Sequence, residues 1–361
     1  MSRAIDAGIE IGSPSDDRRR RAAARMIELL HPPDHHFASG GNVYNRSLVE
    51  AASLRGVALA SRVVEPSAVG LRLHDDCTQL RIWDSLFLDA LAAHDLTATK
   101  DWGLLLHYLP SEDPTRERAE RLRLASMEAR VVDAAALVIV TGHSVQARLG
   151  ERHPHRAVFV CEPGVAAPFL SSRERQAALP GGMIRLLTVA NLLPGKGLLE
   201  LLDMLAGLRD IDWQWHVIGD RVMDPEYTRR FDAAAKRLRL ERRIRQHGVL
   251  DHAAIAQVMD GMDLFVFPSR FEAYGMALAE AAAKGLPAVT TEVGAAARVY
   301  RHGTTALLAA PDDAGRFAAH LQRLLTERAL RERFRDNLRL CKPRKWQDTL
   351  DDFLTATAAL A

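Results

Sequence analysis

Short apolar runs alternate with helical stretches along most of this chain, and this alternation limits its fold more than any other feature. Six such runs precede residue 172, namely MIELLHP, VALASRVV, LRIWDSLFL, GLLLHYL, ALVIVTG and AVFVCEP. Helices are expected between them, for example over about residues 44–54 and 115–132. Because parallel strands need a crossover of a dozen or more residues, the pattern predicts a parallel sheet with crossover helices.

A polar segment over residues 170–182, LSSRERQAALPGG, interrupts the alternation and is the predicted linker. The pattern then restarts with IRLLTVA, WQWHVIG, RIRQHGV, LFVFPS, PAVTTE and TALLAAP, with a helical stretch expected between all but the last pair. A chain of 361 residues also fits two domains better than one core. We therefore expect an α/β protein with two Rossmann-like, doubly wound domains, over residues 25–172 and 183–344.

The two ends of the chain have different sequence patterns. Residues 1–24 are polar and show no periodic apolar pattern, so we expect an N-terminal extension. Residues 316–361 are expected to form two helices divided by Pro343. The arginine-rich start is not followed by the apolar region of a secretory signal, and no apolar run reaches the roughly 18 residues of a membrane span. A cytoplasmic protein is expected.

Charge and cysteine content narrow the classes of partner. Lys and Arg total 48 against 46 Asp and Glu, whereas a dedicated nucleic-acid binder would be far more basic. Cys77, Cys161 and Cys341 are widely spaced and fit neither a disulfide framework nor a zinc site. The expected partner is therefore a small molecule.

The stretch RFEAYGMALAEAAAKGLP follows a predicted strand, where ligands of open α/β sheets bind. Residues 274–277 are expected to be the first helical turn, whose free N–H groups suit a phosphate. Glu280 would lie one turn further on, beside a neutral polyol, and Glu272 would precede the helix. The alternative is that both glutamates are solvated surface charges, but the small apolar residues around Glu280 predict a buried helix, where an unpaired carboxylate is costly.

A second strand end carries the turn Pro-Gly-Lys-Gly, which places Lys196 just before a predicted helix. A lysine there suits neutralisation of a diphosphate, although a solvent-exposed lysine in a turn would be the simpler account of this stretch alone. The turn lacks the phosphate-loop pattern, and the chain has no G-x-G-x-x-G, which argues against a dehydrogenase.

In the first unit, Gly40 and Gly41 are expected just before a helix, where they allow a ligand to approach the backbone closely. His31, His35 and His36 lie nearby without an acidic cluster, so loop histidines are favoured over a metal site. His107 ends a buried strand and either hydrogen-bonds a sugar hydroxyl or is structural.

Taken together, these stretches resemble the family 4 retaining glycosyltransferases of the GT-B fold, from Met26 onward. FEAYGMALAEAAAKGLPAVTTEVGAAARVYRHGTTALL is similar to the family's E-x7-E element, with glutamates at 272 and 280, and the stretch that follows it. LLTVANLLPGKGLLELL resembles its lysine-bearing donor loop and SGGNVYN its glycine-rich loop. VIVTGHSVQARL and VFVCEPGVAAPF resemble the end of its first domain. The resemblance implies two domains facing across a cleft, with residues 345–361 crossing back to the first.

The resemblance also implies roles for residues of the second domain. Glu272 would contact hydroxyls of the donor sugar, Glu280 would bind the nucleotide ribose and Lys196 would hold the diphosphate. The backbone amides of four residues would assist Lys196: Tyr274, Gly275, Met276 and Ala277. Chemistry of this kind needs no metal and no cofactor, because the nucleotide-sugar is itself a substrate.

In the first domain, the resemblance implies that His107 faces the reacting sugar or acceptor, and that Gly40 and Gly41 approach the phosphates. Four residues depart from the family pattern. Asn191 stands where many members carry an arginine that shares the diphosphate charge, and Glu162 changes the usual P-N-G-V to EPGV. Ala295 and Arg298 replace a common glycine and glutamate. These departures concern donor affinity and sugar identity more than the fold.

The expected function is metal-independent, retaining transfer of a hexose-type sugar from a nucleotide-sugar to a hydroxyl acceptor, which is a glycan, a glycolipid or a small molecule. A lipid acceptor would bring the protein to a membrane surface, and no nucleic acid is expected as a partner. Two alternatives stay open: a nucleotide-sugar epimerase of the same fold, and a catalytically silent nucleotide-sugar-binding subunit. The sequence names neither the acceptor nor the base of the donor.

Overall fold

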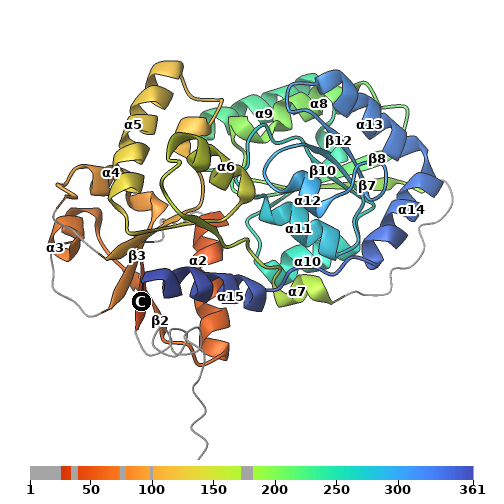
Figure 1. Cartoon of the computed structure of the whole chain (residues 1–361). Coiled ribbons are helices and arrows are strands. Elements are labelled where there is room, and N and C mark those ends of the chain that lie inside the picture. The colour runs from red at the N-terminus through yellow and green to blue at the C-terminus, as the bar shows by residue number, and fades with distance from the viewer. Residues whose placement is uncertain (1–25, 34–39, 74–78, 98–100, 172–181, 361) are drawn as a thin grey trace, which may run out of the picture.

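A computed structural model describes residues 26–33, 40–73, 79–97, 101–171 and 182–360. The first domain contains a six-stranded, all-parallel sheet in the order β2-β1-β3-β4-β5-β6 (Figure 1). Its strands are β1 (Ile27–His31), β2 (Leu59–Val63), β3 (Leu80–Asp84), β4 (Trp102–Leu106), β5 (Leu137–Val140) and β6 (Val158–Val160). The described helices between them are α2 (Gly40–Leu54), α3 (Val69–Leu73), α4 (Leu88–Ala92), α5 (Arg118–Ala134) and α6 (His143–Arg152). The predicted crossover architecture is confirmed.

The second domain repeats this architecture with a parallel sheet in the order β12-β11-β10-β7-β8-β9. Its strands are β7 (Ile184–Val189), β8 (Trp213–Ile218), β9 (Ile244–Gly248), β10 (Leu264–Phe267), β11 (Ala288–Thr291) and β12 (Ala306–Ala309). Its helices are α8 (Leu198–Ala206), α9 (Pro225–Arg237), α10 (His252–Asp260), α11 (Met276–Ala283), α12 (Ala296–Val299), α13 (Ala314–Thr326) and α14 (Arg328–Arg339). The chain leaves β7 toward β8 and β9 and returns to β10 on the other side. The strand order therefore reverses between β7 and β10, where ligands of such sheets bind.

Local sequence explains where several of these helices begin. Asp224 and Asp251 precede α9 and α10, and each carboxylate accepts a hydrogen bond from the backbone N–H three residues later. Asp313 does the same for α13. Such caps satisfy N–H groups that have no partner within the helix. Large buried side chains from the sheet and the helices packed on it form a core cluster of this domain, which includes Trp213, Trp215, Phe231, Phe317 and Phe334.

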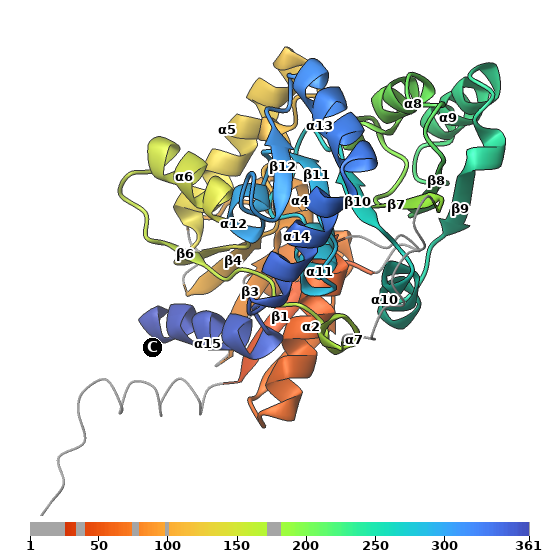
Figure 2. The same cartoon turned by 90° about the vertical axis from the view of Figure 1, so that its right-hand side faces the viewer.

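Helix α15 (Trp346–Thr357) leaves the second domain and packs on the first, beside α2. Figure 2, turned by 90°, shows the same arrangement, with α15 in dark blue near the orange α2. Trp346, Leu350 and Phe353 join the core cluster that contains Tyr44 and other first-domain residues. The Thr349 hydroxyl also donates to the Glu162 carbonyl oxygen at 2.7 Å. The predicted return of residues 345–361 to the first domain is confirmed for the described part of that segment.

Several predicted boundaries are wrong by a few residues. Helix α2 begins at Gly40, so Gly40 and Gly41 form its first turn and do not precede it. Helix α11 begins only at Met276, because Gly275 has a left-handed backbone with φ +87° that no helix accommodates. Tyr274 and Gly275 therefore lie before the helix.

The carboxy-terminal segment contains three helices where two were predicted. Besides the division at Pro343, the chain breaks at Glu327, whose φ of −90° and ψ of 85° are not helical, so α13 and α14 are separate. The short helix α12 also lies between β11 and β12, where none was expected. The predicted extension over residues 1–24, His35, His36 and most of the predicted linker lie outside the described residues.

Candidate active site

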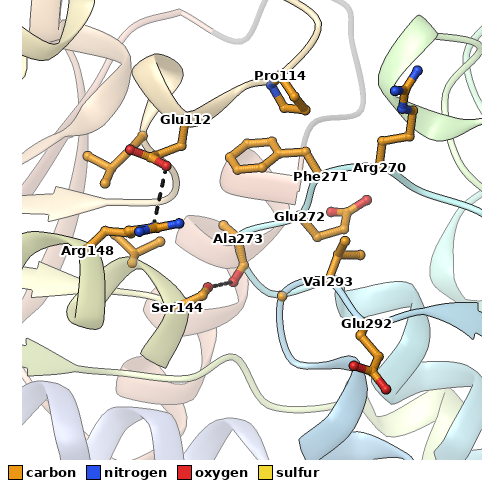
Figure 3. A pocket seen from close by; sticks show the side chains of 13 residues that line it. Glu112, Pro114, Ser144, Arg148, Arg270, Phe271, Glu272, Ala273, Glu292 and Val293 are labelled. Atoms are coloured by element: carbon orange, nitrogen blue, oxygen red, sulfur yellow. Dashed lines mark hydrogen bonds and ion pairs between the residues drawn. The ribbon is translucent and has the colours of Figure 1, made fainter. Parts of the chain in front are cut away.

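A cavity of about 310 Å³ lies between the two domains and has walls from both (Figure 3). The first domain contributes Leu109, Glu112, Pro114, Ser144, Val145 and Arg148; the second contributes Arg270, Phe271, Glu272, Ala273, Glu292, Val293 and Gly294. The domains touch beside it, where the Ser144 hydroxyl donates to the Ala273 carbonyl oxygen at 3.0 Å. Gly142 is also needed here, because a Cβ atom at this position would lie 2.6 Å from the same oxygen. The cavity therefore lies beside a direct contact between the two domains.

Lys196 and Glu272 form an ion pair at the edge of this cavity, with the Lys196 Nζ 2.5 Å from the Glu272 Oε1. They are 76 residues apart but follow β7 and β10, the strands between which the order reverses. The side chains are 25% and 13% exposed. The Ser269 hydroxyl donates to the same carboxylate oxygen at 2.9 Å. The two predicted residues thus meet, and a substrate could reach both.

The loops that carry this pair are fixed to each other by their backbones. The N–H of Arg270 donates to the Gly195 carbonyl oxygen at 2.8 Å. Gly197 has a φ of +68°, and a Cβ atom there would overlap the Pro268 carbonyl oxygen. Gly294, with φ +56°, leaves only 3.0 Å between such an atom and the Glu272 Cβ. Glycine at 197 and 294 is therefore required by both backbone conformation and close packing.

Glu280 projects from α11 and is only 7% exposed. Burial raises the pKa of its carboxyl to about 7, because the charged form loses its hydration. Among the described residues, the basic group within 4 Å of this carboxyl is the His252 ring, whose Nε2 lies 3.9 Å from the Glu280 Oε1. Burial, followed by the Arg46 guanidinium of α2, lowers the pKa of His252, so this ring offers Glu280 little positive charge. Glu280 is therefore not a solvated surface charge.

The residues expected to present backbone amides lie at the domain interface. Tyr274 is buried, and burial, followed by the Glu162 charge, raises its pKa to about 12. Met276 begins α11 and packs against the first-domain cluster that includes Tyr44 and Trp346. Ala277 follows it in the first turn. The amino end of α11 thus faces the first domain.

His107 follows β4 and lies against the start of α2. A Cβ atom on Gly41 would lie 2.9 Å from the His107 Cδ2, whereas Gly40 has open space around it. The His107 Nε2 lies 3.0 Å from the Asp84 Oδ2 and 3.1 Å from the Asn45 Oδ1. Asp84 and Asn45 are buried functional candidates that no sequence pattern indicates. Asp84 ends β3, but LRIWDSLFL read as one apolar strand and concealed this strand end.

The side chain of Asn191 takes part in hydrogen bonds within the second domain. Its side-chain oxygen accepts a hydrogen bond from the Asp220 N–H at 2.9 Å, and the Asp220 carboxylate accepts from the N–H groups of Val222 and Met223. Asn191 therefore holds the turn after β8 in place. That role does not require the charge of the arginine that many family members carry.

Two further departures from the family pattern contact each other. Arg298 of α12 donates through Nε and Nη2 to the two carboxylate oxygens of Glu162, at 3.1 Å each. Glu162 follows β6 of the first domain, so this bidentate pair bridges the domains. Ala295 is buried, and its N–H donates to the Tyr274 carbonyl oxygen at 2.8 Å. The changes at 162 and 298 are therefore complementary in charge.

Within the described ranges, no group of three or more His, Cys, Asp or Glu side chains could hold a metal ion. His31, from the predicted loop histidines, hydrogen-bonds the Ser61 hydroxyl at 2.7 Å. A search of the same ranges finds no helix that is both long and apolar enough to span a membrane.

The fold resembles that of several solved structures along nearly their whole length. Sucrose-phosphate synthase from Thermosynechococcus elongatus superposes with a TM-score of 0.73 at 20% identity, over 91% of this chain and 97% of that one. HepE of Anabaena in complex with UDP and glucose gives 0.73 at 17% identity, over 93% and 100%. The two facing Rossmann-like domains define the GT-B fold.

Residues 172–340 match the family described as Glycosyl transferases group 1. The second domain is therefore similar to this family, in line with the resemblance seen in the sequence. A 2-deoxystreptamine N-acetyl-D-glucosaminyltransferase of Niallia circulans is 31% identical over 34% of this chain and 31% of that protein. A D-inositol 3-phosphate glycosyltransferase of Pseudarthrobacter chlorophenolicus is 28% identical over 60% and 53%. The chain thus matches about half or less of the length of these relatives.

Proposed function

We propose that the protein is a retaining glycosyltransferase that moves a hexose-type sugar from a nucleoside-diphosphate sugar to a hydroxyl acceptor. The observation that carries this proposal is the meeting of Lys196 and Glu272 at the reversal of strand order, beside a cavity between the domains. The match of the second domain to the group 1 family supports it. HepE, whose structure contains UDP and glucose, has a similar fold, and this likeness is consistent with a donor of that kind.

Lys196 has the position and charge to stabilise the leaving diphosphate. In the free protein its ammonium is neutralised by Glu272, so a bound donor would take over part of this ion pair. The phosphates would receive the Nζ donor, and Glu272 would accept hydrogen bonds from hydroxyls of the sugar. Glu280 would accept from the ribose hydroxyls. The amides at the start of α11 would add the positive end of a helix dipole.

The reaction breaks the bond between the sugar C1 and the diphosphate oxygen and forms a bond from C1 to the acceptor oxygen on the same face. A phosphate oxygen takes the proton of the acceptor hydroxyl. The residues act by placing the two substrates and by stabilising the negative charge that develops on the diphosphate. No protein nucleophile and no metal is required by this scheme.

We place the acceptor in the cavity beside Glu272. Its volume of about 310 Å³ is at the lower end of the range typical of small-molecule sites. Phe271 offers an apolar ring face, and Glu112 and Arg148 form a polar wall in which the Arg148 Nε lies 3.5 Å from the Glu112 Oε2. An apolar face beside paired charges suits a sugar-like polyol.

A panel of UDP-, GDP- and ADP-sugars tests the proposal first by thermal shift, since a ligand that binds only the folded protein raises its melting temperature. The stabilising donor is then incubated with a panel of sugar acceptors, and the anomeric configuration of the product is read by NMR. Transfer with retained configuration supports the proposal. A new isomer formed from the donor alone would indicate an epimerase, and donor binding without transfer or hydrolysis a silent binding subunit; either result overturns it.

A further inference from the structure

A buried cluster of Asp84, Asn45 and His107 remains outside the scheme above. We propose that Asp84 and Asn45 are positioning residues that fix His107 as the tautomer with its proton on Nε2, so that Nδ1 is offered to a substrate hydroxyl as a hydrogen-bond acceptor. The assignment of the tautomer stands on the cluster itself. Only the identity of the hydroxyl rests on the proposed function.

Three hydrogen bonds close the cluster. The Asn45 Nδ2 donates to the Asp84 Oδ2 at 2.5 Å, and the His107 Nε2 lies 3.0 Å from this same oxygen. The third contact joins the His107 Nε2 to the Asn45 Oδ1 at 3.1 Å. The Leu86 N–H holds the other oxygen of Asp84 at 2.7 Å. Each side chain thus constrains the other two.

The chemistry of the donors fixes the hydrogens that lie between the three side chains. An ionised carboxylate only accepts hydrogen bonds, so Asn45 must turn its amide nitrogen toward Asp84. The amide oxygen of Asn45 then faces His107. With two oxygens that both accept, the Nε2 atom has to carry a hydrogen. The neutral ring consequently keeps its lone pair on Nδ1.

Asp84 is suited to stay ionised in this place although it is fully buried. Burial alone would raise the pKa of its carboxyl, but its interactions with His107 and the hydrogen bonds from Leu86 and Asn45 lower the pKa below the ordinary value, and these hydrogen bonds persist when the His107 ring is neutral. A carboxylate that orients a histidine in this way is a recurring device for setting its tautomer.

The packing fixes the ring as well as its proton. Tyr44 meets His107 edge-on, with ring centroids 5.2 Å apart, and Gly41 lies against the Cδ2 side. The His107 side chain keeps 10% of its surface exposed. No described residue hydrogen-bonds the Nδ1 atom. The Nδ1 atom of a neutral His107 can therefore accept from a hydroxyl, whereas an unprotonated phosphate oxygen offers it no hydrogen.

Nitrogen NMR of the histidine side chains in the full chain tests the tautomer without any substrate. The His107 signals are assigned by their loss in His107→Gln, and the spectra are recorded at pH 8. We expect a pyrrole-like Nε2 and a pyridine-like Nδ1. In Asp84→Asn, an amide can turn either atom toward the ring, so the signals should move toward a mixture of tautomers. Glu28→Gln, which neutralises a buried carboxylate of β1, should leave them unchanged.

A neutral His107 with its proton on Nδ1 in the wild type overturns the inference, even where Asp84→Asn does not fold. So does an unchanged His107 spectrum in a folded Asp84→Asn protein. Once a donor and an acceptor are known, Asp84→Asn should lower kcat by about a hundredfold, because the ring is misplaced, with donor affinity and the Glu28→Gln control near wild type. If the tautomer is as expected but no donor binds, the proposed function fails while the positioning of His107 stands.

Discussion

At the scale of single residues, Glu272 and Glu280 are eight positions apart and have opposite surroundings. Glu272 is paired with Lys196 at 2.5 Å, whereas Glu280 is buried and, among the described residues, has only the His252 ring at 3.9 Å as an ion-pair partner. A buried carboxylate without a strong partner lowers the stability of a fold. A ligand that hydrogen-bonds this carboxylate would offset that cost, and under the proposed function this ligand is the ribose of the donor.

Glu280→Gln is therefore expected to stabilise the free protein while weakening donor binding. The folded-state pKa of about 7 lies above the ordinary value of 4.5, so the folded protein binds the proton more tightly than the unfolded one. The contribution of the protonated group is fully present below about pH 4.5 and is lost as the pH rises through 7. At pH 8 the substitution should raise the free energy of unfolding by up to about 3 kcal/mol, and at pH 5 by little.

Urea unfolding at pH 5 and pH 8 measures this difference, and Glu241→Gln, an exposed glutamate, is the matched control. Equal stability of Glu280→Gln and wild type at pH 8 would contradict the buried, weakly paired carboxylate. Unchanged affinity for the nucleoside diphosphate would contradict the ribose assignment alone.

The sequence identified the residues at strand ends but not their partners. Lys196 and Glu272 could be predicted as site candidates because polar residues stand out after apolar runs, and Glu280 because it is a lone carboxylate among small apolar residues of a predicted helix. Their pairing could not, because contact between residues 76 positions apart depends on which strands are neighbours. Asp84 was missed for a related reason, since an apolar 3-10 turn and helix follow β3 directly and hide where the strand stops.

At the scale of elements, the glycine turn between β7 and α8 determines where Lys196 lies. Gly197 and Gly303 both have positive φ, of 68° and 73°. A Cβ atom would overlap the Pro268 carbonyl oxygen at Gly197, whereas Gly303 has open space within 4 Å. Both alanine variants carry the strain of a left-handed backbone. Only Gly197→Ala also forces apart the loop with Lys196 and the loop with Pro268.

Gly303→Ala should cost about 1 kcal/mol of stability and leave donor binding unchanged. Gly197→Ala should cost more and weaken donor binding, because the loop with Lys196 must move away from Glu272. Thermal unfolding and calorimetric titration of both variants measure this. Equal effects of the two substitutions on binding would show that the close approach at Gly197 does not position the site.

Element boundaries were less predictable than element types. Alternating apolar runs located all twelve described strands, because a parallel sheet demands that pattern. The start of α11 depends on the φ of Gly275, which a local window of sequence does not reveal. Gly41 lies in the first turn of α2 and against His107, a residue far along the chain, and this contact is equally invisible in a local window.

At the scale of the whole molecule, the two domains are joined by α15 and by the bidentate pair of Arg298 and Glu162. Both members of the pair depart from the family pattern, and the departures match in charge. Arg298 is 55% exposed and Glu162 13%, so solvent screens much of the attraction. The pair therefore contributes more to the relative placement of the domains than to overall stability.

A double-mutant cycle with Arg298→Ala and Glu162→Ala should give a favourable coupling of about 0.5 to 1 kcal/mol in unfolding free energy. The pair of Arg323, in α13, and Glu327, which directly follows this helix, is the control inside one domain, and a weaker coupling is expected for it because both side chains are solvent-exposed. Small-angle scattering should show a changed domain arrangement only for the first pair. Zero coupling together with an unchanged scattering profile would show that the matched charges do not hold the domains.

The central claim is that the second domain binds a nucleoside diphosphate through Lys196, and calorimetric titration of UDP, GDP and ADP into the protein tests it most directly. One of the three is expected to bind with one site per chain. Lys196→Ala should weaken this binding tenfold or more, which corresponds to about 1.4 kcal/mol. Lys236→Ala, at an exposed lysine of α9, should leave it unchanged. Absence of binding by all three nucleotides, or equal affinity in Lys196→Ala and wild type, would contradict the account.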